Sequence, residues 1–510
     1  MIQLLDCTLR DGGYYTNWDF DKSVVNDYVK YACQLPLDYI EIGYRNPLKE
    51  QIYKGEYFHL DQDKIRQLKD QLKGKKVALM LDAKFIQPAE IKNLLSPIKQ
   101  DVDLIRMAVN PQDVERCIEL GSEIVKLGIP IAFNLMYIST GVITPAVLDQ
   151  IIHCGIPIEF LYLVDSYGGA TPNQVKELVN YIKSNSNFKV GFHAHNNLEM
   201  ALANTIVAID EGVDIIDATV SGMGRGAGNL KTELLLTYLL ARDTIKCDME
   251  VLGKLVDVFK PLMDQFNWGT NLPYMISGAM NIPQGTVMNW ISTDRYSEND
   301  IVGKVIALQN DKLPGFSKID QIDNRKVEKV MIIGGGPSVM HNLDKVVRLL
   351  QTTNYKVLIT GVKDLKELSA QMRAFSLCIS GKQIHALKSV EAKEKEKIDE
   401  IILPNDTLGI EVNDIQDVVE KCYQLGNISY PDSSEDSPLM LALEFAEKFK
   451  KEVELIGFDG YPLSSSKGQI LNRVNQEIFN HYMNKGMTLT SLTNSSYSVP
   501  TSSIHAMTMN

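Results

Sequence analysis

Residues 188–229 read FKVGFHAHNNLEMALANTIVAIDEGVDIIDATVSGMGRGAGN, and this stretch decides the fold. Its pattern predicts a short strand at 188–192, an amphipathic helix at 198–211 and a second strand at 213–218. A strand, a helix and another strand in this order are typical of a parallel sheet whose strands are joined by helical crossovers. The stretch therefore predicts an α/β protein.

The same alternation runs back from this stretch to the N-terminus. The predicted strands lie at 2–5, 38–43, 76–81, 102–107, 130–135, 160–164, 188–192 and 213–218. The predicted helices include 23–34, 61–73, 114–127, 172–184 and 198–211. Eight such repeats within about 235 residues favour a closed (β/α)8 TIM barrel, with an open doubly wound sheet as the alternative.

Ionisable and amide side chains stand near the ends of these predicted strands. They are Arg10, Asp11, Glu41, Asp82, Arg106, Asn134, Asp165, His193 and His195. The loops that follow the strands build the catalytic face of a TIM barrel. Their convergence therefore indicates an enzyme.

His193 and His195 are the sharpest local feature, because side chains two positions apart in an extended strand point the same way. Asp11, after the neighbouring first strand, adds a carboxylate, and this donor set suits a divalent cation that keeps open positions for substrate. An isolated pair of this kind more often caps a strand. Only eight histidines occur in 510 residues, so two at the predicted catalytic rim favour a metal site.

Five motifs then carry a family resemblance. They are DCTLRDGG (6–13), IEIGYRNP (40–47), LYLVDSYGGATP (161–172), GFHAHNN (191–197) and SGMGRGAGNLKTE (221–233). Together they resemble the metallolyase barrels related to isopropylmalate synthase and 3-hydroxy-3-methylglutaryl-CoA lyase, over about residues 1–290. The stretch 191–233 is most similar to 4-hydroxy-2-oxovalerate aldolase. The acyl-CoA lyases of this group carry a cysteine in a longer version of the glycine-rich loop. Residues 221–229 of this chain contain no cysteine.

The resemblance implies how the site works. Asp11, His193 and His195 would hold Mn²⁺ or Mg²⁺, and a 2-oxo acid such as pyruvate would chelate this cation. Arg10 would stabilise the negative charge of an enolate, and Glu41 would orient Arg10. These roles predict an aldolase or lyase that acts on a 4-hydroxy-2-oxo acid and an aldehyde.

Two further positions are less determined. Asn229 would lie beside the metal in the matching GN motif, although a loop-capping role is equally compatible with the sequence. Tyr14 stands where the closest relatives carry a histidine, and a phenol has an ordinary pKa of about 10, far from the optimum for a general base. Tyr14 would transfer the proton or orient a water. Tyr14, Tyr15 and Tyr44 together could form a polar wall for a hydroxylated, sugar-like aldehyde, or simply pack with wet tips.

The chain is long enough for more than one domain. We predict the barrel at 1–250, accessory helices at 251–315, a linker at 316–325 and an open, Rossmann-like α/β domain at 326–510. The accessory helices resemble those that make subunit contacts in the aldolases, which implies a homodimer.

The second domain opens with KVMIIGGGPSVM at 329–340, a strand followed by a glycine-rich turn. Gly334, Gly335, Gly336 and Ser338 would offer backbone N–H groups to a nucleotide phosphate, but Val339 stands where a third glycine of the dinucleotide motif belongs. The runs IGGGPS, SPLMLALEFAEKF, IGFDGY and SYSVPTSSI resemble the bacterial sialyltransferase and 6-hydroxymethylpterin diphosphokinase-like superfamily. That resemblance implies a nucleotide or phosphate-bearing ligand. A domain kept only for interaction is the alternative.

Composition excludes several other classes. A net charge of −12 argues against a nucleic-acid partner. Seven cysteines without a C-x-x-C spacing argue against a disulfide framework or a thiolate zinc site. Without a long apolar run or a signal peptide, the sequence predicts no membrane insertion and a cytoplasmic location.

The sequence thus favours a metal-dependent aldolase or lyase whose product enters surface-glycan or sugar-acid metabolism, with the second domain making the protein bifunctional. Two alternatives stay open. One is a glycosyl- or nucleotidyl-type transferase centred on the C-terminal domain, with a non-catalytic barrel. The other is a Claisen-type acyl-CoA synthase.

Overall fold

The computed structural model describes residues 2–47, 54–309, 316–319, 327, 329–404, 415, 417–425, 436–449 and 452–508. Tertiary contacts divide the chain into two compact units, Met1–Gly285 and Thr286–Asn510. Each unit contains its own parallel β-sheet and its own hydrophobic clusters. The predicted α/β class is confirmed.

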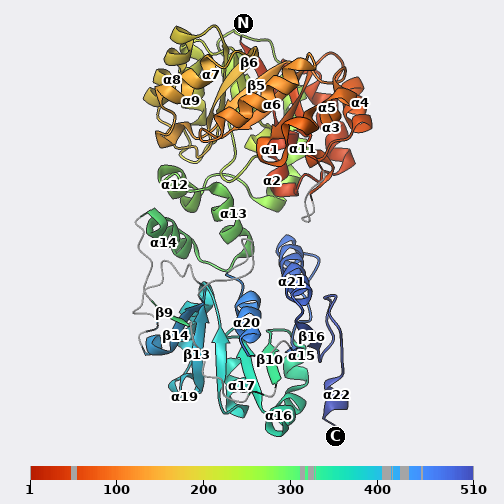
Figure 1. Cartoon of the computed structure of the whole chain (residues 1–510), viewed down its shortest axis with the longest axis vertical. Helices are drawn as coiled ribbons and strands as arrows, with labels where there is room; N and C mark the ends of the chain where they lie inside the picture. The colour runs from red at the N-terminus through yellow and green to blue at the C-terminus, as the bar shows by residue number, and fades with distance from the viewer. Residues whose placement is uncertain are drawn as a thin grey trace. The chain divides into compact units, whose positions relative to one another are not determined.

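The first unit is a closed barrel of eight parallel strands (Figure 1), so the predicted barrel is confirmed and the open sheet is wrong for this unit. The strands are β1 (Gln3–Asp6), β2 (Tyr39–Tyr44), β3 (Lys76–Asp82), β4 (Leu104–Val109), β5 (Ile131–Leu135), β6 (Ile158–Asp165), β7 (Lys189–Ala194) and β8 (Ile215–Ala218). Each strand pairs with the next, and β1 pairs with β8 to close the barrel. All eight predicted strands are present, with ends shifted by one or two residues.

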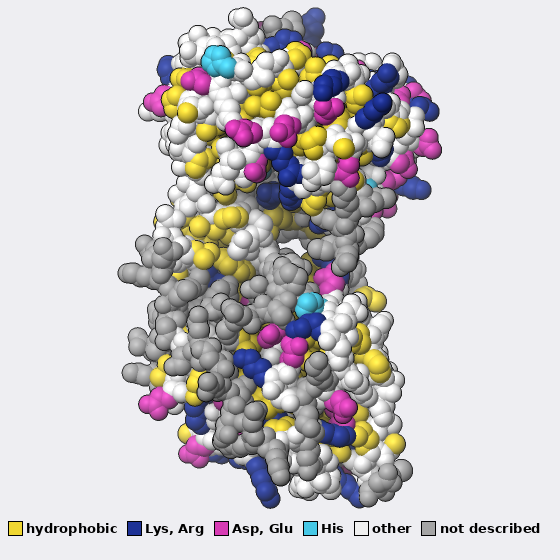
Figure 2. Space-filling view, in the orientation of Figure 1, with side chains coloured by type: hydrophobic (Ala, Val, Ile, Leu, Met, Phe, Trp, Pro, Cys, Tyr) yellow, Lys and Arg dark blue, Asp and Glu magenta, His cyan; other side chains and the backbone are white. Residues whose placement is uncertain are grey.

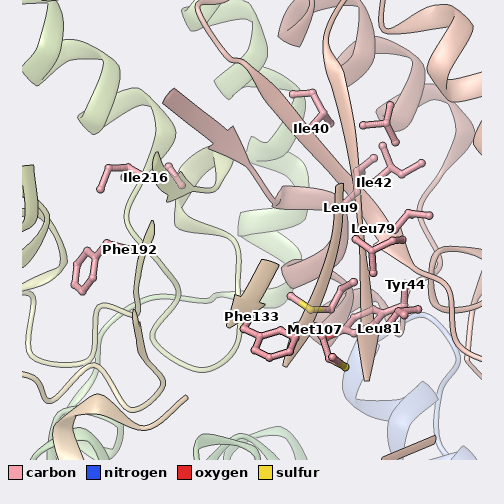
Figure 3. Packing of buried hydrophobic residues seen from close by; sticks show 14 of the residues in the cluster. Leu9, Ile40, Ile42, Tyr44, Leu79, Leu81, Met107, Phe133, Phe192 and Ile216 are labelled. Atoms are coloured by element: carbon pink, nitrogen blue, oxygen red, sulfur yellow. The ribbon is translucent and has the colours of Figure 1, made fainter. Parts of the chain in front are cut away.

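Helices cover the outside of this barrel (Figure 1). They include α3 (Lys22–Ala32), α4 (Gln62–Gln71), α5 (Ile91–Leu95), α6 (Val114–Lys126), α7 (Pro145–Ile152), α8 (Pro172–Asn185), α9 (Ala201–Asp210) and α10 (Thr232–Leu240), whereas the short α1 (Thr8–Asp11) and α2 (Gly13–Thr16) belong to the segment that follows β1. In α6, Cys117, Leu120 and Ile124 are buried at three- and four-residue spacing, as expected for a helix with one apolar face. Outward-facing strand residues such as Ile40, Phe192 and Ile216 belong to the same apolar cluster as these helices (Figure 3).

The barrel interior is layered, because alternate strand residues point inward. One layer is apolar, and two residues further along the same strands the inward positions carry charge. The three pairs are Tyr39 and Glu41, Leu104 and Arg106, and Ile215 and Asp217. The polar layer therefore lies toward the carboxyl ends of the strands, which is the face expected for a catalytic site.

Four helices follow between residues 249 and 309. They are α11 (Met249–Phe266), α12 (Leu272–Ala279), α13 (Gln284–Thr293) and α14 (Glu298–Gln309). The predicted linker at 316–325 lies partly outside the described residues, which omit 320–325. The finer partition at residues 250, 315 and 325 stays a prediction.

The second unit contains an eight-stranded parallel sheet in the order β16-β15-β10-β11-β12-β13-β14-β9. Its strands are β9 (Ser317–Ile319), β10 (Lys329–Ile333), β11 (Tyr355–Ile359), β12 (Phe375–Cys378), β13 (Ile398–Leu403), β14 (Cys422–Leu425), β15 (Glu452–Ile456) and β16 (Thr488–Ser491). Along β10, Val330 and Ile332 join one hydrophobic cluster whereas Met331 and Ile333 join another. Apolar residues thus cover both faces, as in sheets built from crossover units.

Helices pack on both faces of this sheet. The cluster containing Val330 includes residues of α20 (Pro438–Glu447) and α21 (Ser466–Asn484). The cluster containing Met331 includes residues of α16 (Leu343–Thr352), α17 (Leu365–Gln371), α18 (Lys382–Ala386) and α22 (Ile504–Met507). Two further short helices are α15 (Ser338–His341) and α19 (Ala392–Lys395).

The surface of the first unit carries Lys and Arg side chains interspersed with Asp and Glu on the face that Figure 2 shows. Among the described residues, no helix has both the length and the apolar character needed to cross a bilayer.

Candidate metal and substrate site

The carboxyl ends of the barrel strands open into a cavity of about 340 Å³. Polar residues from several strand ends line it, including Arg10, Asp11, Tyr14, Tyr44, Asp82, Asn134, His193, His195 and Arg225. This volume suits a small molecule. Residues that are far apart in the sequence therefore share one small-molecule-sized space.

Asp11, His193 and His195 meet in this cavity. Asp11 is the last residue of α1, directly after β1, and its Oδ2 lies 3.3 Å from His193 Nε2. The ring centroids of His193 and His195 are 5.1 Å apart. His195 Nδ1 lies 2.9 Å from the carbonyl oxygen of Asp165, and this contact holds the ring in place.

The protonation of the three groups follows from burial and neighbours. Burial lowers the pKa of His195 to about 3, so this imidazole is neutral and its lone pair is available. Burial also opposes a charge on His193, but hydrogen bonds with Asp11 and Asp217 raise its pKa overall. Burial opposes ionisation of Asp11, yet the adjacent Arg10 guanidinium and His193 hold the pKa of this carboxyl well below its usual range. Asp11 is therefore a carboxylate.

Asp217 is a functional candidate that the sequence reasoning missed. Its Oδ2 lies 2.8 Å from His193 Nδ1, on the side of the imidazole away from Asp11. The same carboxylate forms an ion pair with Arg106, whose guanidinium lies 4.2 Å from the Tyr162 ring centroid. The sequence does carry a signal, since an acidic residue interrupts the apolar β8 run IIDA.

Arg106 continues the chain of contacts back to the cavity. Its Nη1 lies 3.0 Å from Glu41 Oε2, which also accepts a 2.8 Å hydrogen bond from Arg10 Nε. Arg10 in turn forms an ion pair with Asp11. These contacts close a ring of six buried groups, here named the charge ring: Asp11, Arg10, Glu41, Arg106, Asp217 and His193.

Cys7 also comes close to this group, because one donor atom from each of Cys7, Asp11 and His193 lies within 4.8 Å of the others. Burial raises the pKa of the Cys7 thiol well above its ordinary value, and the thiol contacts the Ala218 carbonyl oxygen at 3.5 Å. Metal binding requires the thiolate. His195 lines the same cavity with a neutral imidazole, but among the described residues it is not one of the three whose donor atoms lie within 4.8 Å of one another.

Asn229 lies beside Asp11. Its Nδ2 donates a 2.6 Å hydrogen bond to Asp11 Oδ2, whereas its Oδ1 is buried and accepts no hydrogen bond from the described residues. Gly224 makes room for this side chain, since a Cβ there would lie 2.7 Å from the Asn229 amide. A carboxylate, an imidazole and an unused amide oxygen lie near one another, with a second imidazole on the same cavity, and all of these donor types bind divalent cations.

Two of the three predicted tyrosines line the cavity. Tyr14 accepts a hydrogen bond from the Arg225 guanidinium, which also lies 4.0 Å from the Tyr14 ring centroid. Tyr44 is another lining residue. Tyr15 instead donates a 2.7 Å hydrogen bond to the Gly226 carbonyl oxygen and packs 5.9 Å from Trp268, so it does not join that wall.

The predicted phosphate loop of the second unit is occupied by a side chain. Its members are Gly334, Gly335, Gly336 and Ser338, between β10 and α15. The Ser338 N–H donates a 2.8 Å hydrogen bond to Asp459 Oδ2, and the Ser338 hydroxyl also bonds to Asp459. A carboxylate thus takes the N–H that the prediction assigned to a phosphate, and nucleotide binding stays a prediction.

The first unit is a closed parallel barrel that carries acidic, imidazole and guanidinium groups at the carboxyl ends of its strands. This arrangement defines a TIM-barrel protein with an enzyme-like site. The chain belongs to the HMGL-like family, whose model matches residues 1–258. This match confirms the predicted family of the barrel. It ends before residue 326, so the sialyltransferase-like resemblance of the second domain stays a prediction.

Individual relatives agree with the family. A 4-hydroxy-2-oxovalerate aldolase of Bacillus cereus is 28% identical over 258 residues, which are 50% of this chain and 74% of that protein. An oxaloacetate decarboxylase of Mycobacterium tuberculosis is 28% identical over 242 residues, 47% of this chain and 70% of that protein.

Two solved structures are also similar. The N-terminal domain of a Bacteroides vulgatus protein provisionally described as an aldolase is 44% identical, covers 59% of this chain and 99% of its own, and has a TM-score of 0.56. The carboxyl transferase domain of Rhizobium etli pyruvate carboxylase, crystallised with 3-hydroxypyruvate, is 15% identical, with a TM-score of 0.50 over 60% of this chain and 56% of that one. The second likeness shows the fold alone.

Proposed function

We propose that the barrel is a divalent-metal-dependent aldolase that breaks or forms the C3–C4 bond of a 4-hydroxy-2-oxo acid through the enolate of pyruvate or a similar 2-oxo acid. The observation that carries this proposal is that Asp11, His193, His195 and Arg10 line one cavity, with Asp11 Oδ2 3.3 Å from His193 Nε2. The names of the aldolase and decarboxylase relatives add support, since both describe breaking a carbon–carbon bond of a 2-oxo acid.

Asp11, His193, His195 and the free Oδ1 of Asn229 would hold the cation, which we propose to be Mn²⁺ or Mg²⁺. When bound, the cation supplies a fixed positive charge that polarises the keto group of the 2-oxo acid. The protein contributes the orientation of the ligands. The Asp217 contact with His193 Nδ1 leaves Nε2 facing Asp11, and the Asp165 carbonyl oxygen plays the same part for His195.

Arg10 is proposed to stabilise the oxygen that becomes negative in the enolate. Its guanidinium lines the cavity, and Asp11 and Glu41 hold it from two sides. Glu41 is fully buried, so it fixes Arg10 without reaching the solvent. A donor held in place before the reaction stabilises developing charge without reorganising.

Proton transfer completes the reaction. In the cleavage direction the 4-hydroxyl loses its proton, the C3–C4 bond breaks, the aldehyde leaves, and C3 of the enolate takes a proton. We assign the proton on the 4-hydroxyl to Tyr14, which lines the cavity and accepts a hydrogen bond from Arg225. The hydrogen bond from Arg225 would hold the Tyr14 hydroxyl in place for this transfer.

The experiment is hydrogen exchange into pyruvate. We expect the protein with Mn²⁺ to incorporate deuterium from D₂O into the pyruvate methyl group, and His193→Ala to lose this activity. His153→Ala is the matched control, because His153 is exposed and its Nδ1 contacts only the Asp149 carbonyl oxygen at 2.8 Å. A wild-type protein that exchanges no methyl hydrogen overturns the proposal, and consumption of an acyl-CoA would favour the Claisen-type synthase.

The second domain enters this proposal only as a prediction. A nucleotide ligand, a transferase activity and a bifunctional protein would follow from its resemblance to the sialyltransferase-like superfamily. Nucleotide binding that survives loss of both His193 and His195 would favour the transferase alternative. The homodimer and the cytoplasmic location likewise stay predictions.

A further inference from the structure

Arg225 is a charged residue of the cavity that the proposed function uses only through Tyr14. It lies in the glycine-rich segment after β8, between Gly224 and Gly226. Gly226 has a φ of +65°, and a Cβ there would lie 2.0 Å from Gln284 Oε1. Tyr15 also bonds to the Gly226 carbonyl oxygen. The backbone beside Arg225 is therefore firmly placed, and its side chain lines the cavity.

The Arg225 guanidinium has no carboxylate partner among the residues that the structure describes. Arg10 pairs with Asp11 and Glu41, and Arg106 pairs with Glu41 and Asp217. Arg225 itself donates a hydrogen bond to the Tyr14 hydroxyl, and its guanidinium lies 4.0 Å from the Tyr14 ring centroid. A guanidinium carries five N–H donors, so most of these remain available to a ligand.

The carboxylates of the charge ring cannot serve Arg225, because each already contacts a guanidinium of the ring. Of the other two lining carboxylates, Asp82 pairs with Lys84 at 3.2 Å, and no ion pair joins Asp113 to Arg225 among the described residues. An unmatched cation directed into a substrate cavity indicates an acidic group on the substrate.

The position of Arg225 indicates which substrate carries that group. Arg10 touches Asp11 directly, whereas Arg225 touches Tyr14, the residue assigned to the proton of the 4-hydroxyl. In a 4-hydroxy-2-oxo acid this hydroxyl belongs to the half that leaves as the aldehyde. Tyr14 takes one N–H of Arg225 Nη2, so the remaining N–H groups of the guanidinium are left for a bidentate contact with an anion.

We propose that Arg225 binds a carboxylate or phosphate monoester on the aldehyde partner, so that this barrel selects anionic aldehydes. The inference rests on the proposed function and names the substrate class of the same site. Arg225 is then a specificity-determining residue, and the 2-oxo acid carboxylate is bound elsewhere in the cavity.

Condensation of pyruvate with matched aldehydes tests the proposal. Comparing succinic semialdehyde with butanal tests for recognition of a carboxylate. Comparing glyceraldehyde 3-phosphate with glyceraldehyde tests for recognition of a phosphate. We expect the wild type with Mn²⁺ to favour the anionic member of at least one pair by about tenfold or more in kcat/KM, and Arg225→Gln to lose that preference. The pair that shows the preference identifies the acidic group.

Deuterium exchange into pyruvate separates an effect on the 2-oxo acid from an effect on the aldehyde, because the exchange needs no aldehyde. We expect Arg225→Gln to lower condensation with the anionic aldehydes by about tenfold more than it lowers this exchange, and Arg225→Lys to recover part of the preference for the anion. Arg242→Gln is the matched control, since Arg242 also stacks on a tyrosine, 4.4 Å from the Tyr238 ring centroid, but is exposed and outside the cavity lining. It should change neither reaction.

Three outcomes overturn the inference. The first is a wild type whose kcat/KM does not favour the anionic aldehyde of either pair. The second is an Arg225→Gln variant that loses deuterium exchange and condensation to the same extent, which would assign Arg225 to the 2-oxo acid. The third comes from calorimetric titration in the presence of Mn²⁺ with 2-oxoglutarate, which carries a second carboxylate, and with 2-oxopentanoate, which does not. If wild type and Arg225→Gln bind 2-oxoglutarate with the same affinity, Arg225 does not bind the second carboxylate. This titration needs no turnover, so it separates failure of the inference from failure of the aldolase proposal.

Discussion

Asp217 Oδ2 lies 2.8 Å from His193 Nδ1, and the opposite nitrogen of the same imidazole lies 3.3 Å from Asp11 Oδ2. One histidine thus joins the carboxylate at the end of β1 to a carboxylate within β8. A hydrogen bond from a ligand imidazole to a carboxylate fixes the tautomer and increases the basicity of the other nitrogen. Metal binding at this site should therefore depend on Asp217.

Asp217→Asn should weaken Mn²⁺ binding by about 10- to 100-fold, because His193 loses its carboxylate partner. Calorimetric titration of the purified protein with Mn²⁺ measures this change. Asp101→Asn is the control, since Asp101 pairs only with Arg66 at the surface, at 3.4 Å. Equal affinities in wild type and Asp217→Asn would contradict the assigned role.

Mn²⁺ affinity should fall as the pH is lowered. The pKa of His193 is raised by its hydrogen bonds with Asp11 and Asp217, so the proton competes with the cation already below this raised pKa. The dissociation constant should rise by about tenfold for each pH unit below that point and stay level above it.

Asp217→Asn removes one of the contacts that raise the pKa of His193. The decline of Mn²⁺ affinity should therefore begin at a lower pH in this variant, although its affinity at high pH is weaker. Titrations at a series of pH values give both onsets. An onset at the same pH in both proteins would show that another group controls the competition.

Arg106→Met should lower the free energy of unfolding by about 3–5 kcal/mol, because it leaves Glu41 and Asp217 buried with less compensating charge. Arg66→Met should cost less than about 1 kcal/mol, since the Arg66 side chain is half exposed and its pair with Asp101 is screened by solvent. Urea unfolding followed by tryptophan fluorescence compares the two. Similar losses would mean that the charge ring contributes little to stability.

Tyr14→Phe should slow aldol cleavage by about 100-fold or more, because the group assigned to the 4-hydroxyl proton is lost while the ring that stacks on Arg225 remains. Mn²⁺ affinity should stay unchanged. Tyr15→Phe loses a hydroxyl that binds the Gly226 carbonyl oxygen outside the cavity lining, and it should cleave at nearly the wild-type rate. If Tyr14→Phe cleaves as fast as Tyr15→Phe, another group transfers the proton.

Gly336→Ala should destabilise the second unit by about 1–3 kcal/mol, as expected for a methyl group added to a packed site. The new Cβ would lie 2.6 Å from the Gly457 carbonyl oxygen and 2.7 Å from Asp459 Cγ. Gly335→Ala is a neighbouring control, because the atom nearest to its Cβ is Lys363 Cδ at 4.0 Å. Thermal unfolding should separate the two variants, and equal melting temperatures would contradict the tight approach at Gly336.

The site was predictable in part. Side-chain alternation in β7 is a local property, so the common direction of His193 and His195 follows from their spacing. Barrel closure then predicts that Asp11 is near them, since it places the first strand beside the last. The tyrosine wall shows the limit of such reasoning. Tyr14 and Tyr15 are adjacent in sequence, but only Tyr14 lines the cavity, because the turn of α2 directs Tyr15 toward Trp268.

The sequence by itself determined the barrel, its family and the strand ends that carry Asp11 and the two histidines, because strand periodicity and motif order are recorded along the chain. Only the tertiary structure decided that Arg106 contacts Asp217, 111 residues away, and that Arg225 faces Tyr14 without a carboxylate partner among the described residues. A buried charge takes the partner that the packed barrel brings near it. That choice depends on distances across the barrel interior, which no local pattern of residues contains.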